Sequence, residues 1–146
     1  MKLTIDRMSL LRPLGHVQSV VERRNTIPIL ANVVLQAEDG KLSLTATDMD
    51  MTIATEVGCA VATSGITTLS AHMLYDIARK LPEGAEVELS VADGHANISA
   101  GRSSFRLPTL PFEDFPEISS SDLPVNFILT AADLRDLIDA TRIAIS

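Results

Sequence analysis

Hydrophobic and polar residues follow two different periods in the first part of the chain. Near the N-terminus, apolar and polar residues alternate, which predicts a short strand from Leu3 to Ile5. We expect a helix next, beginning at Asp6 or Ser9 and ending at Glu22. Its apolar residues recur at spacings of four, three and four, as on one face of a helix: Leu10, Leu14, Val17 and Val21.

Three strand-like runs follow this helix, at residues 29–36, 42–47 and 49–57. Pro28 precedes the first run, and it should exclude helix at Ile27 and start the strand, because a residue before proline avoids helical geometry. Glu38-Asp39-Gly40 is typical of a turn. After Thr47-Asp48 the apolar residues change parity, so we expect a bulge or a tight turn there.

The same order of elements recurs between residues 65 and 110. A short strand precedes Ser70, a candidate helix N-cap, and the helix after it should end before Pro82. The apolar face of that helix comprises Leu74, Ile77, Ala78 and Leu81. Two strands joined by a hairpin turn at Asp93-Gly94, and a third strand at 103–109, complete the second copy.

Residues 1–60 and 65–110 are therefore two copies of one unit, a strand, a helix and three strands. A single helix cannot cover a sheet, so the two copies should pack together as one two-layer domain. We predict an α+β fold in which both helices lie on one face of antiparallel sheets.

The stretch from Pro111 to Pro124 is rich in proline, serine and acidic residues, which indicates a linker. Beyond it the opening pattern returns, with a strand near 127–129 and a capping signal formed by Thr130 with Asp133. We expect one domain at 1–124, of which 111–124 is the linker. Residues 125–146 should be the first strand and helix of a truncated second domain, cut from a longer polypeptide or ending early.

Positive charge is concentrated on the two helical segments. The chain carries a net charge of −7, yet residues 7–24 and 71–81 together hold six cations and two carboxylates, a net +4 that leaves −11 elsewhere. On the first helix the polar face opposite the core holds Arg12, His16, Ser19 and Arg23, and on the second it holds His72, Asp76 and Arg79. Pro13 must lie in the first turns of its helix or kink it.

Side by side, these helices would form one cationic surface suited to a phosphate backbone. A solvated helix face is the plainer interpretation, and the acidic remainder of the chain argues against it. The chain has one tyrosine and no tryptophan, so single-strand stacking is not expected, whereas sequence-independent contact with duplex DNA remains open.

No group of residues predicts catalysis, a metal site or a cofactor. Asp48 and Asp50 could share a cation or a proton, but we interpret Asp48 as a structural turn carboxylate. The three histidines lack metal-ligand spacing and are expected on the surface. One cysteine, no secretory signal and no apolar run of about 20 residues favour a cytoplasmic protein without a membrane span.

Phe105 and Leu107 share one face of the last predicted strand, with Arg102 beside them. They are either core residues or part of an apolar edge that recruits a partner strand. The second possibility supports an alternative function, a small acidic protein-interaction domain that uses this edge and does not contact DNA.

Several segments resemble a known family in sequence and in order: "MKLTIDRMSLL", "TIPILANVVLQAEDGKLSLTATDMDM", "LPEGAEVELSV" and "GRSSFRLPTLPFEDFP". Together they are similar to the N-terminal domain of the bacterial sliding clamps, the beta subunits of DNA polymerase III. The resemblance implies a non-enzymatic DNA polymerase processivity factor for DNA replication. Clamps are head-to-tail homodimer rings that encircle duplex DNA and tether the replicative polymerase.

The resemblance also implies roles for individual residues. Arg24 is the best candidate for DNA binding and Arg79 matches a second channel-facing position, while Arg12, Arg23 and Lys80 follow from charge and helical phase. Phe105, Leu107 and Arg102 match the dimer interface. The family binds DNA polymerase III and the clamp loader between its second and third domains, which this chain lacks. A chain of this length therefore cannot close a two-chain ring.

Overall fold

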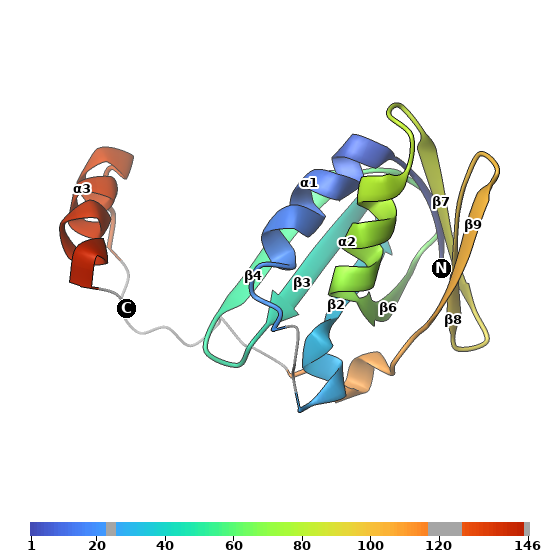
Figure 1. Cartoon of the computed structure of the whole chain (residues 1–146), viewed down its shortest axis with the longest axis horizontal. Coiled ribbons are helices and arrows are strands. Elements are labelled where there is room, and N and C mark those ends of the chain that lie inside the picture. The colour runs from blue at the N-terminus through green and yellow to red at the C-terminus, as the bar shows by residue number, and fades with distance from the viewer. Residues whose placement is uncertain (23–25, 117–126, 145–146) are drawn as a thin grey trace.

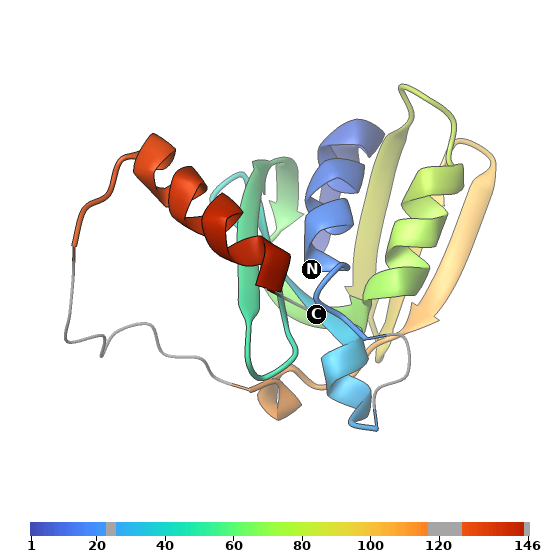
Figure 2. The same ribbon diagram turned by 60° about the vertical axis from the view of Figure 1, so that its left-hand side comes forward.

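The computed structural model describes residues 1–22, 26–116 and 127–144. Two antiparallel sheets carry the helices α1, Arg7–Val17, and α2, Ala71–Lys80, on one side (Figures 1 and 2). The first sheet has the order β5-β1-β7-β8-β9, and its strands are Ala60–Thr63, Lys2–Asp6, Glu86–Ala92, His95–Ala100 and Ser103–Pro108. The second has the order β4-β3-β2-β6, and its strands are Thr52–Gly58, Lys41–Thr47, Asn32–Glu38 and Gly65–Ser70.

The two copies of the repeated unit exchange their first strands. Strand β1 pairs with β7 of the second copy, with Leu3 opposite Leu89, and β6 pairs with β2 of the first copy, with Leu69 opposite Val33. Each helix therefore follows a strand that lies in the other copy's sheet. The expected α+β arrangement of two strand-helix-three-strand repeats is confirmed, and the exchange makes neither copy complete without the other.

One continuous core lies between the sheets and the helices. Its largest fully buried side chains come from both helices and from inward positions of strands in both sheets, among them Leu10, Leu14, Leu74, Leu3, Leu35, Leu44 and Leu89. A smaller cluster on the outer side of the second sheet joins Phe115 to Ile29, Leu30 and Val34. The apolar helix faces predicted from sequence thus bury the sheets' inner surface.

Helix α1 begins where the sequence predicts, but it ends earlier. The Asp6 carboxylate accepts hydrogen bonds from the backbone N–H groups of Met8 and Ser9, at 2.9 and 3.0 Å, which caps the helix. The α-helix ends at Val17 rather than Glu22, and tighter i→i+3 turns continue to Val21. The hydroxyl of Ser19 donates to the His16 carbonyl at 2.6 Å, a local bond that competes with regular helix.

Pro13 lies inside α1, beyond its first turn, and is buried against the sheet. Pro28 does exclude helix at Ile27, whose φ and ψ of −104° and 107° are extended. It does not start the strand, however. Pro28–Ala31 forms a short 3₁₀ helix, η1, because proline suits the first position of a helical turn. Strand β2 consequently begins at Asn32.

Tight turns join the predicted strands. Asp39 and Gly40 both have positive φ, 48° and 75°, as a two-residue hairpin requires. The parity change after Thr47 is a turn: the Asp48 carboxylate accepts from the N–H groups of Asp50 and Met51, at 3.0 and 2.7 Å. This bonding confirms the interpretation of Asp48 as a turn carboxylate. The strand expected at 49–57 therefore starts later, at Thr52.

Helix α2 matches its prediction closely. Ser70 occupies the N-cap position, although its side chain makes no capping hydrogen bond. The third strand of the second copy, β9, lies at the edge of its sheet, as the apolar-edge hypothesis assumed. After it come the short 3₁₀ helix η2, Phe112–Asp114, and an isolated bridge between Leu110 and Thr68 of β6.

The strand and helix expected within residues 125–146 are confirmed only in part. Helix α3, Ala131–Thr141, has Thr130 as its N-cap, with the hydroxyl oxygen accepting from the Asp133 N–H at 3.1 Å. A final turn, η4, spans Arg142–Ala144. The expected strand at 127–129 is not formed, and these residues pair with no strand of the described chain. Within the described residues, no helix is long and apolar enough to cross a membrane.

Candidate nucleic-acid interface

The two helices lie antiparallel and are joined at both ends. At one end the Arg7 guanidinium donates hydrogen bonds to the carbonyl oxygens of Ala78 and Arg79, each at 2.9 Å. At the other end His72 Nε2 lies 2.9 Å from the carbonyl oxygen of Val21. These contacts hold α1 and α2 as one layer, which is side by side in both views (Figures 1 and 2).

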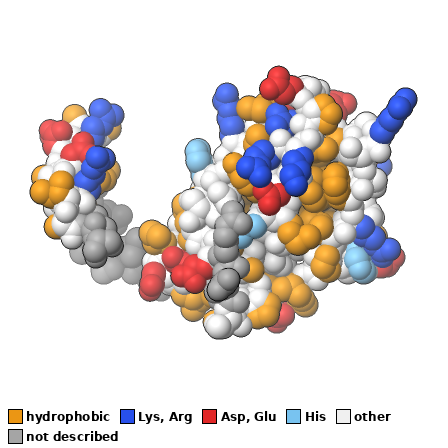
Figure 3. Space-filling model, in the orientation of Figure 1, with side chains coloured by type: hydrophobic (Ala, Val, Ile, Leu, Met, Phe, Trp, Pro, Cys, Tyr) orange, Lys and Arg blue, Asp and Glu red, His pale blue; other side chains and the backbone are white. Residues whose placement is uncertain are grey.

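Lys and Arg side chains gather on the outer surface of this layer (Figure 3). Arg12 on α1 and Arg79 and Lys80 on α2 are all exposed, as the helical phase of the sequence predicts. Arg79 forms an ion pair with Asp76 at 3.1 Å, and its guanidinium lies 5.9 Å from the centre of the Tyr75 ring. Both partners are on α2, so they orient Arg79 on the helix surface without burying it.

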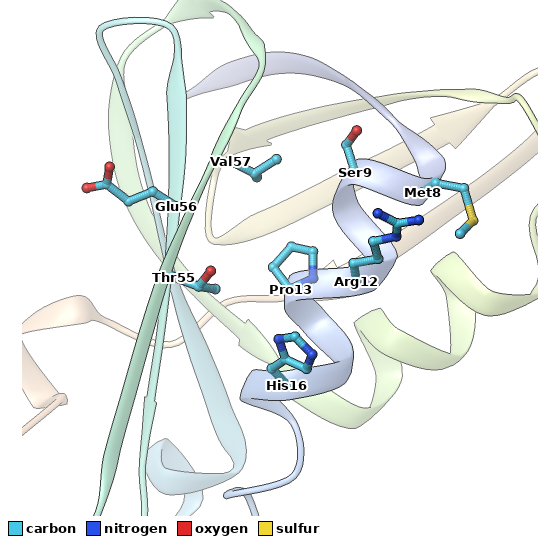
Figure 4. Close-up of a pocket in the computed structure, with 8 residues that line it drawn as sticks. All are labelled: Met8, Ser9, Arg12, Pro13, His16, Thr55, Glu56 and Val57. Carbon is cyan, nitrogen blue, oxygen red and sulfur yellow. The ribbon is translucent and has the colours of Figure 1, made fainter. Parts of the chain in front are cut away.

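An open groove of about 460 Å³ borders the cationic layer where α1 meets β4. Arg12 and His16 project from the helix and Thr55 projects toward them from β4 (Figure 4). Glu56 points away from the helix in the same view, and its carboxylate pairs with Lys41 at 3.1 Å. Within the described residues, Glu56 of β4 is therefore paired with Lys41 and not with Arg12 of α1.

Two of the predicted DNA-binding residues, Arg23 and Arg24, lie outside the described residues. The exposed cations that the structure brings together are thus Arg12, Arg79 and Lys80. Arg7, which also contributed to the positive charge of the first helix, has a different role. It is only 8% exposed, and its guanidinium donates a hydrogen bond at the carboxyl end of α2 and does not contribute to the exposed cationic surface.

The prediction that the histidines lie on the surface is correct for His16 and wrong for His72. His16 is exposed on α1, and His95 is half-buried, with Nδ1 lying 2.9 Å from the Asp93 carbonyl. His72 is half-buried between the helices, where Nδ1 has no hydrogen-bond partner in the described part of the chain. Its bond to Val21 makes it a link between helices.

Asp48 and Asp50, which were considered for a shared cation or proton, lie in the turn before β4. The Asp48 carboxylate is engaged by two backbone N–H groups, and Asp50 is exposed. Among residues 1–22, 26–116 and 127–144, no three His, Cys, Asp or Glu side chains are grouped so that they could hold a metal ion.

The predicted dimer-interface residues divide into two kinds. Leu107 on β9 is 5% exposed and belongs to the main core. Phe105 lies two residues earlier on the same side of β9 and is 36% exposed, and Arg102 is exposed at the turn before β9. Phe105 therefore provides the apolar surface at this sheet edge, and Leu107 mainly supports the fold.

Sequence reasoning did not identify the cap formed by Arg7. The residue appeared only as one of several cations, because a local pattern cannot show that the start of one helix meets the end of another. A helix C-terminus attracts cations, and Leu81 follows α2 without a glycine cap. The absence of a glycine cap was the signal in the sequence that a side chain from elsewhere in the chain would cap the carboxyl end of α2.

Comparisons with known proteins agree with this geometry. The family model described as the N-terminal domain of the DNA polymerase III beta subunit matches residues 1–119. The beta sliding clamps of Caulobacter vibrioides (strain NA1000 / CB15N) and Escherichia coli (strain K12) are 54% and 40% identical over all of this chain. The chain spans about 40% of the length of each of these curated relatives.

The solved structures that the chain matches belong to the same family. The chain matches the Caulobacter crescentus pol III beta with a TM-score of 0.94 at 55% identity, covering 100% of this chain and 40% of that one. It matches a Bartonella birtlesii sliding clamp, solved bound to griselimycin, with a TM-score of 0.95 at 43% identity, covering 100% and 39%. The clamp fold predicted from sequence is confirmed. The chain belongs to the DNA polymerase III beta subunit family, of which it carries the N-terminal domain.

Proposed function

We propose that this chain is the N-terminal part of a sliding clamp, a non-enzymatic processivity factor that encircles duplex DNA and tethers the replicative polymerase in the cytoplasm. The observation that carries the proposal is the helix layer, which presents Arg12, Arg79 and Lys80 on one face of a chain whose net charge is −7. Membership of the clamp family supports the same function.

In this proposal the helix layer faces the DNA. Exposed arginine and lysine side chains attract phosphates without reading base edges, so binding is independent of sequence and the protein can move along the duplex. Arg23 and Arg24 follow α1 in the chain, and we assign them to the same surface by charge and by family resemblance. His16 lies beside Arg12 on α1 and adds a polar contact at the groove.

The edge strand β9 is the proposed contact with a second protomer in a head-to-tail homodimer. Phe105 offers exposed apolar area and Arg102 a charge beside it, while the unpaired side of β9 offers backbone hydrogen-bonding groups. The alternative function, an interaction domain without DNA contact, would use the same edge. It leaves the cationic helix layer unexplained.

Residues 1–124 form the clamp domain in this proposal, with 111–124 as its linker, and 125–146 begin the second domain. Helix α3 supports this division, since its exposed Leu134 and Ile138 lie 124 residues after Leu10 and Leu14, their buried counterparts in α1. Polymerase III and the clamp loader would bind the full protein through domains beyond these residues.

Loading on nicked circular DNA tests the proposal. We expect the intact protein, once loaded, to remain on the circle and to be lost when the circle is cut, because a ring holds DNA topologically. Blocking both ends of the cut DNA with bound protein should restore retention. Stable retention on linear DNA with free ends would overturn the proposal.

A further inference from the structure

The cationic helix layer contains one negative charge of its own. Among the residues of α1 and α2, all of which the structure describes, Asp76 is the only one with a carboxylate. It lies one helical turn before Arg79, and its side chain is 47% exposed. The exposed cations of the layer are Arg12, Arg79 and Lys80, so one carboxylate accompanies three positive charges. A negative charge on a surface that attracts phosphates needs an explanation.

The carboxylate of Asp76 is paired with one of these cations. Its Oδ1 accepts a hydrogen bond from Nη2 of Arg79 at 3.1 Å, and both side chains of this i,i+3 pair are about half exposed. Surface ion pairs of this kind add little to folding stability. The main consequence of the pair is therefore electrostatic, because it neutralises part of the positive charge that the layer presents.

Tyr75 supports Arg79 independently of the ion pair. The Arg79 guanidinium lies 5.9 Å from the centre of the Tyr75 ring, which is a cation–π contact. The ring packs against the main core, and its Cε2 lies 3.7 Å from the position that a Cβ on Gly15 of α1 would take. Arg79 therefore does not need Asp76 to hold its orientation. The distinct contribution of Asp76 is its negative charge.

The other cations of the layer have no such partner. Within the described residues, neither Arg12 nor Lys80 forms an ion pair. Glu22 and Glu83, which follow the two helices, are also not paired with the cations of the layer in this part of the chain. The effect of Asp76 is thus specific to Arg79.

A carboxylate beside Arg79 weakens the contact of that arginine with DNA in two ways. It repels an approaching phosphate, and it competes with the phosphate for the guanidinium N–H groups. A protein that moves along a duplex must also break its phosphate contacts at each step. When Arg79 leaves a phosphate, Asp76 is available as its partner, so exchange from one phosphate to the next is faster.

We propose that Asp76 acts through Arg79 as a positioning residue that limits the affinity of the helix layer for phosphate and keeps the protein mobile on DNA. This inference rests on the proposed function, since it concerns the same DNA-facing layer. Without the carboxylate, Arg79 should hold phosphates of duplex DNA more tightly, whatever the base sequence, and the protein should move more slowly.

Asp76→Asn tests the proposal in the intact protein, with affinity for a duplex of random sequence measured by fluorescence anisotropy at several salt concentrations. We expect the Kd to fall by about threefold at low salt, the order of one surface ion pair. The gain should shrink as salt rises, because exposed charges are screened. Asp76→Glu, which keeps the charge, should match the unchanged protein. Asp93→Asn removes the same charge at the exposed turn between β7 and β8 and should have no such effect.

The effect should also depend on Arg79. In an Arg79→Gln protein, Asp76→Asn should leave the Kd nearly unchanged. Single-molecule tracking of the loaded ring should show slower diffusion of the Asp76→Asn protein along DNA. Weaker binding by Asp76→Asn, or an equal change with and without Arg79, would overturn the inference.

Failure of this inference can be told apart from failure of the proposed function. If the unchanged protein leaves cut circular DNA through its free ends but Asp76→Asn alters neither Kd nor diffusion, only the role of Asp76 is wrong. If the unchanged protein stays on linear DNA with free ends, the proposed function is wrong and the role of Asp76 in sliding is lost with it.

Discussion

The guanidinium of Arg7 caps the carboxyl end of α2 by donating to the carbonyl oxygen of Ala78, 71 positions away in the sequence, at 2.9 Å. A second bond to the Arg79 carbonyl, also at 2.9 Å, satisfies another C-terminal acceptor of that helix. The positive charge of Arg7 is also favourable there, because the helix dipole places partial negative charge at the carboxyl end of a helix. The start of α1 and the end of α2 are thereby held together beneath the proposed DNA surface.

Arg7→Ala should lower the free energy of unfolding by about 1.5–3 kcal/mol, since it removes charged hydrogen bonds to buried acceptors. Arg12→Ala is the matched control, because Arg12 lies on the same helix but is exposed; its effect should stay within about 0.5 kcal/mol. Urea unfolding followed by circular dichroism measures both. Equal effects of the two substitutions would contradict a capping role.

Asp6 should make stability depend on pH. The Ser9 N–H, with further hydrogen bonds from this first turn, lowers the pKa of the Asp6 carboxyl below its usual value of 3.8. A lowered folded-state pKa means that the contribution is present above the unfolded-state pKa and is lost as pH falls through the folded-state value. Stability due to Asp6 is therefore complete above about pH 5 and declines at more acidic pH.

Asp6→Asn tests this dependence, because asparagine is also a good N-cap but does not titrate. Melting temperatures of the two proteins should be similar when Asp6 is protonated and should diverge in favour of aspartate as the pH rises to 6. Asp6→Ala should be less stable than either at pH 6. A constant difference between aspartate and asparagine across the pH range would exclude the carboxylate as the source.

The hydroxyl of Thr68 joins the two sheets at the corner where β9 ends. It accepts from Asn32 Nδ2 at 3.0 Å and from the Leu110 N–H at 3.2 Å, and it lies 2.9 Å from the Leu110 carbonyl, to which it donates. Thr68→Val keeps the shape but leaves the buried Asn32 amide unpaired, so we expect a loss of about 1–3 kcal/mol.

Thr67→Val provides the control on the same strand. Thr67 is also buried, but its hydroxyl makes no hydrogen bond within the described residues, so its replacement should change stability by less than about 0.5 kcal/mol. Thermal unfolding measures both variants. If Thr67→Val destabilises as much as Thr68→Val, the loss comes from strand packing and not from the hydroxyl.

Local patterns in the sequence predicted the elements that local chemistry determines. The helix start near Asp6, the turn at Asp48 and the exposed phase of Arg12 depend on neighbours within a few residues, and all three are confirmed. The end of α1 was misplaced because apolar spacing continues to Val21 while the backbone tightens into i→i+3 turns. Spacing does not distinguish those two geometries.

Features that depend on distant contacts could not be predicted in this way. The exchange of β1 and β6 between repeats, the pairing of β5 with β1, and the link from His72 to Val21 all join residues far apart in sequence. The cationic surface was anticipated from charge, but not the engagement of Arg7 within the fold.

Charge reversal on the helix layer should weaken DNA binding. Arg12→Glu with Arg79→Glu removes two proposed phosphate contacts, so the slope of log affinity against log salt should fall by about two. Lys2→Glu with Lys41→Glu changes charge equally on the sheet face, where both lysines are exposed, and is the control. Affinity for a duplex of random sequence, measured at several salt concentrations, compares them. Equal losses in both double variants would indicate a general charge effect.

The exposed apolar face of α3 can be used to test whether this helix begins a second domain. Leu134 and Ile138 are 48% and 52% exposed in this chain, whereas their counterparts Leu10 and Leu14 are 1% and 0% exposed. Leu134→Ala should therefore leave the unfolding of residues 1–146 unchanged within about 0.5 kcal/mol, while Leu10→Ala should cost about 2–5 kcal/mol. In a chain extended through the next domain, Leu134→Ala should become as costly as Leu10→Ala, because the added sheet would bury it. If Leu134→Ala remains neutral in the extended chain, α3 is not the counterpart of α1, and the domain division at residue 124 is wrong.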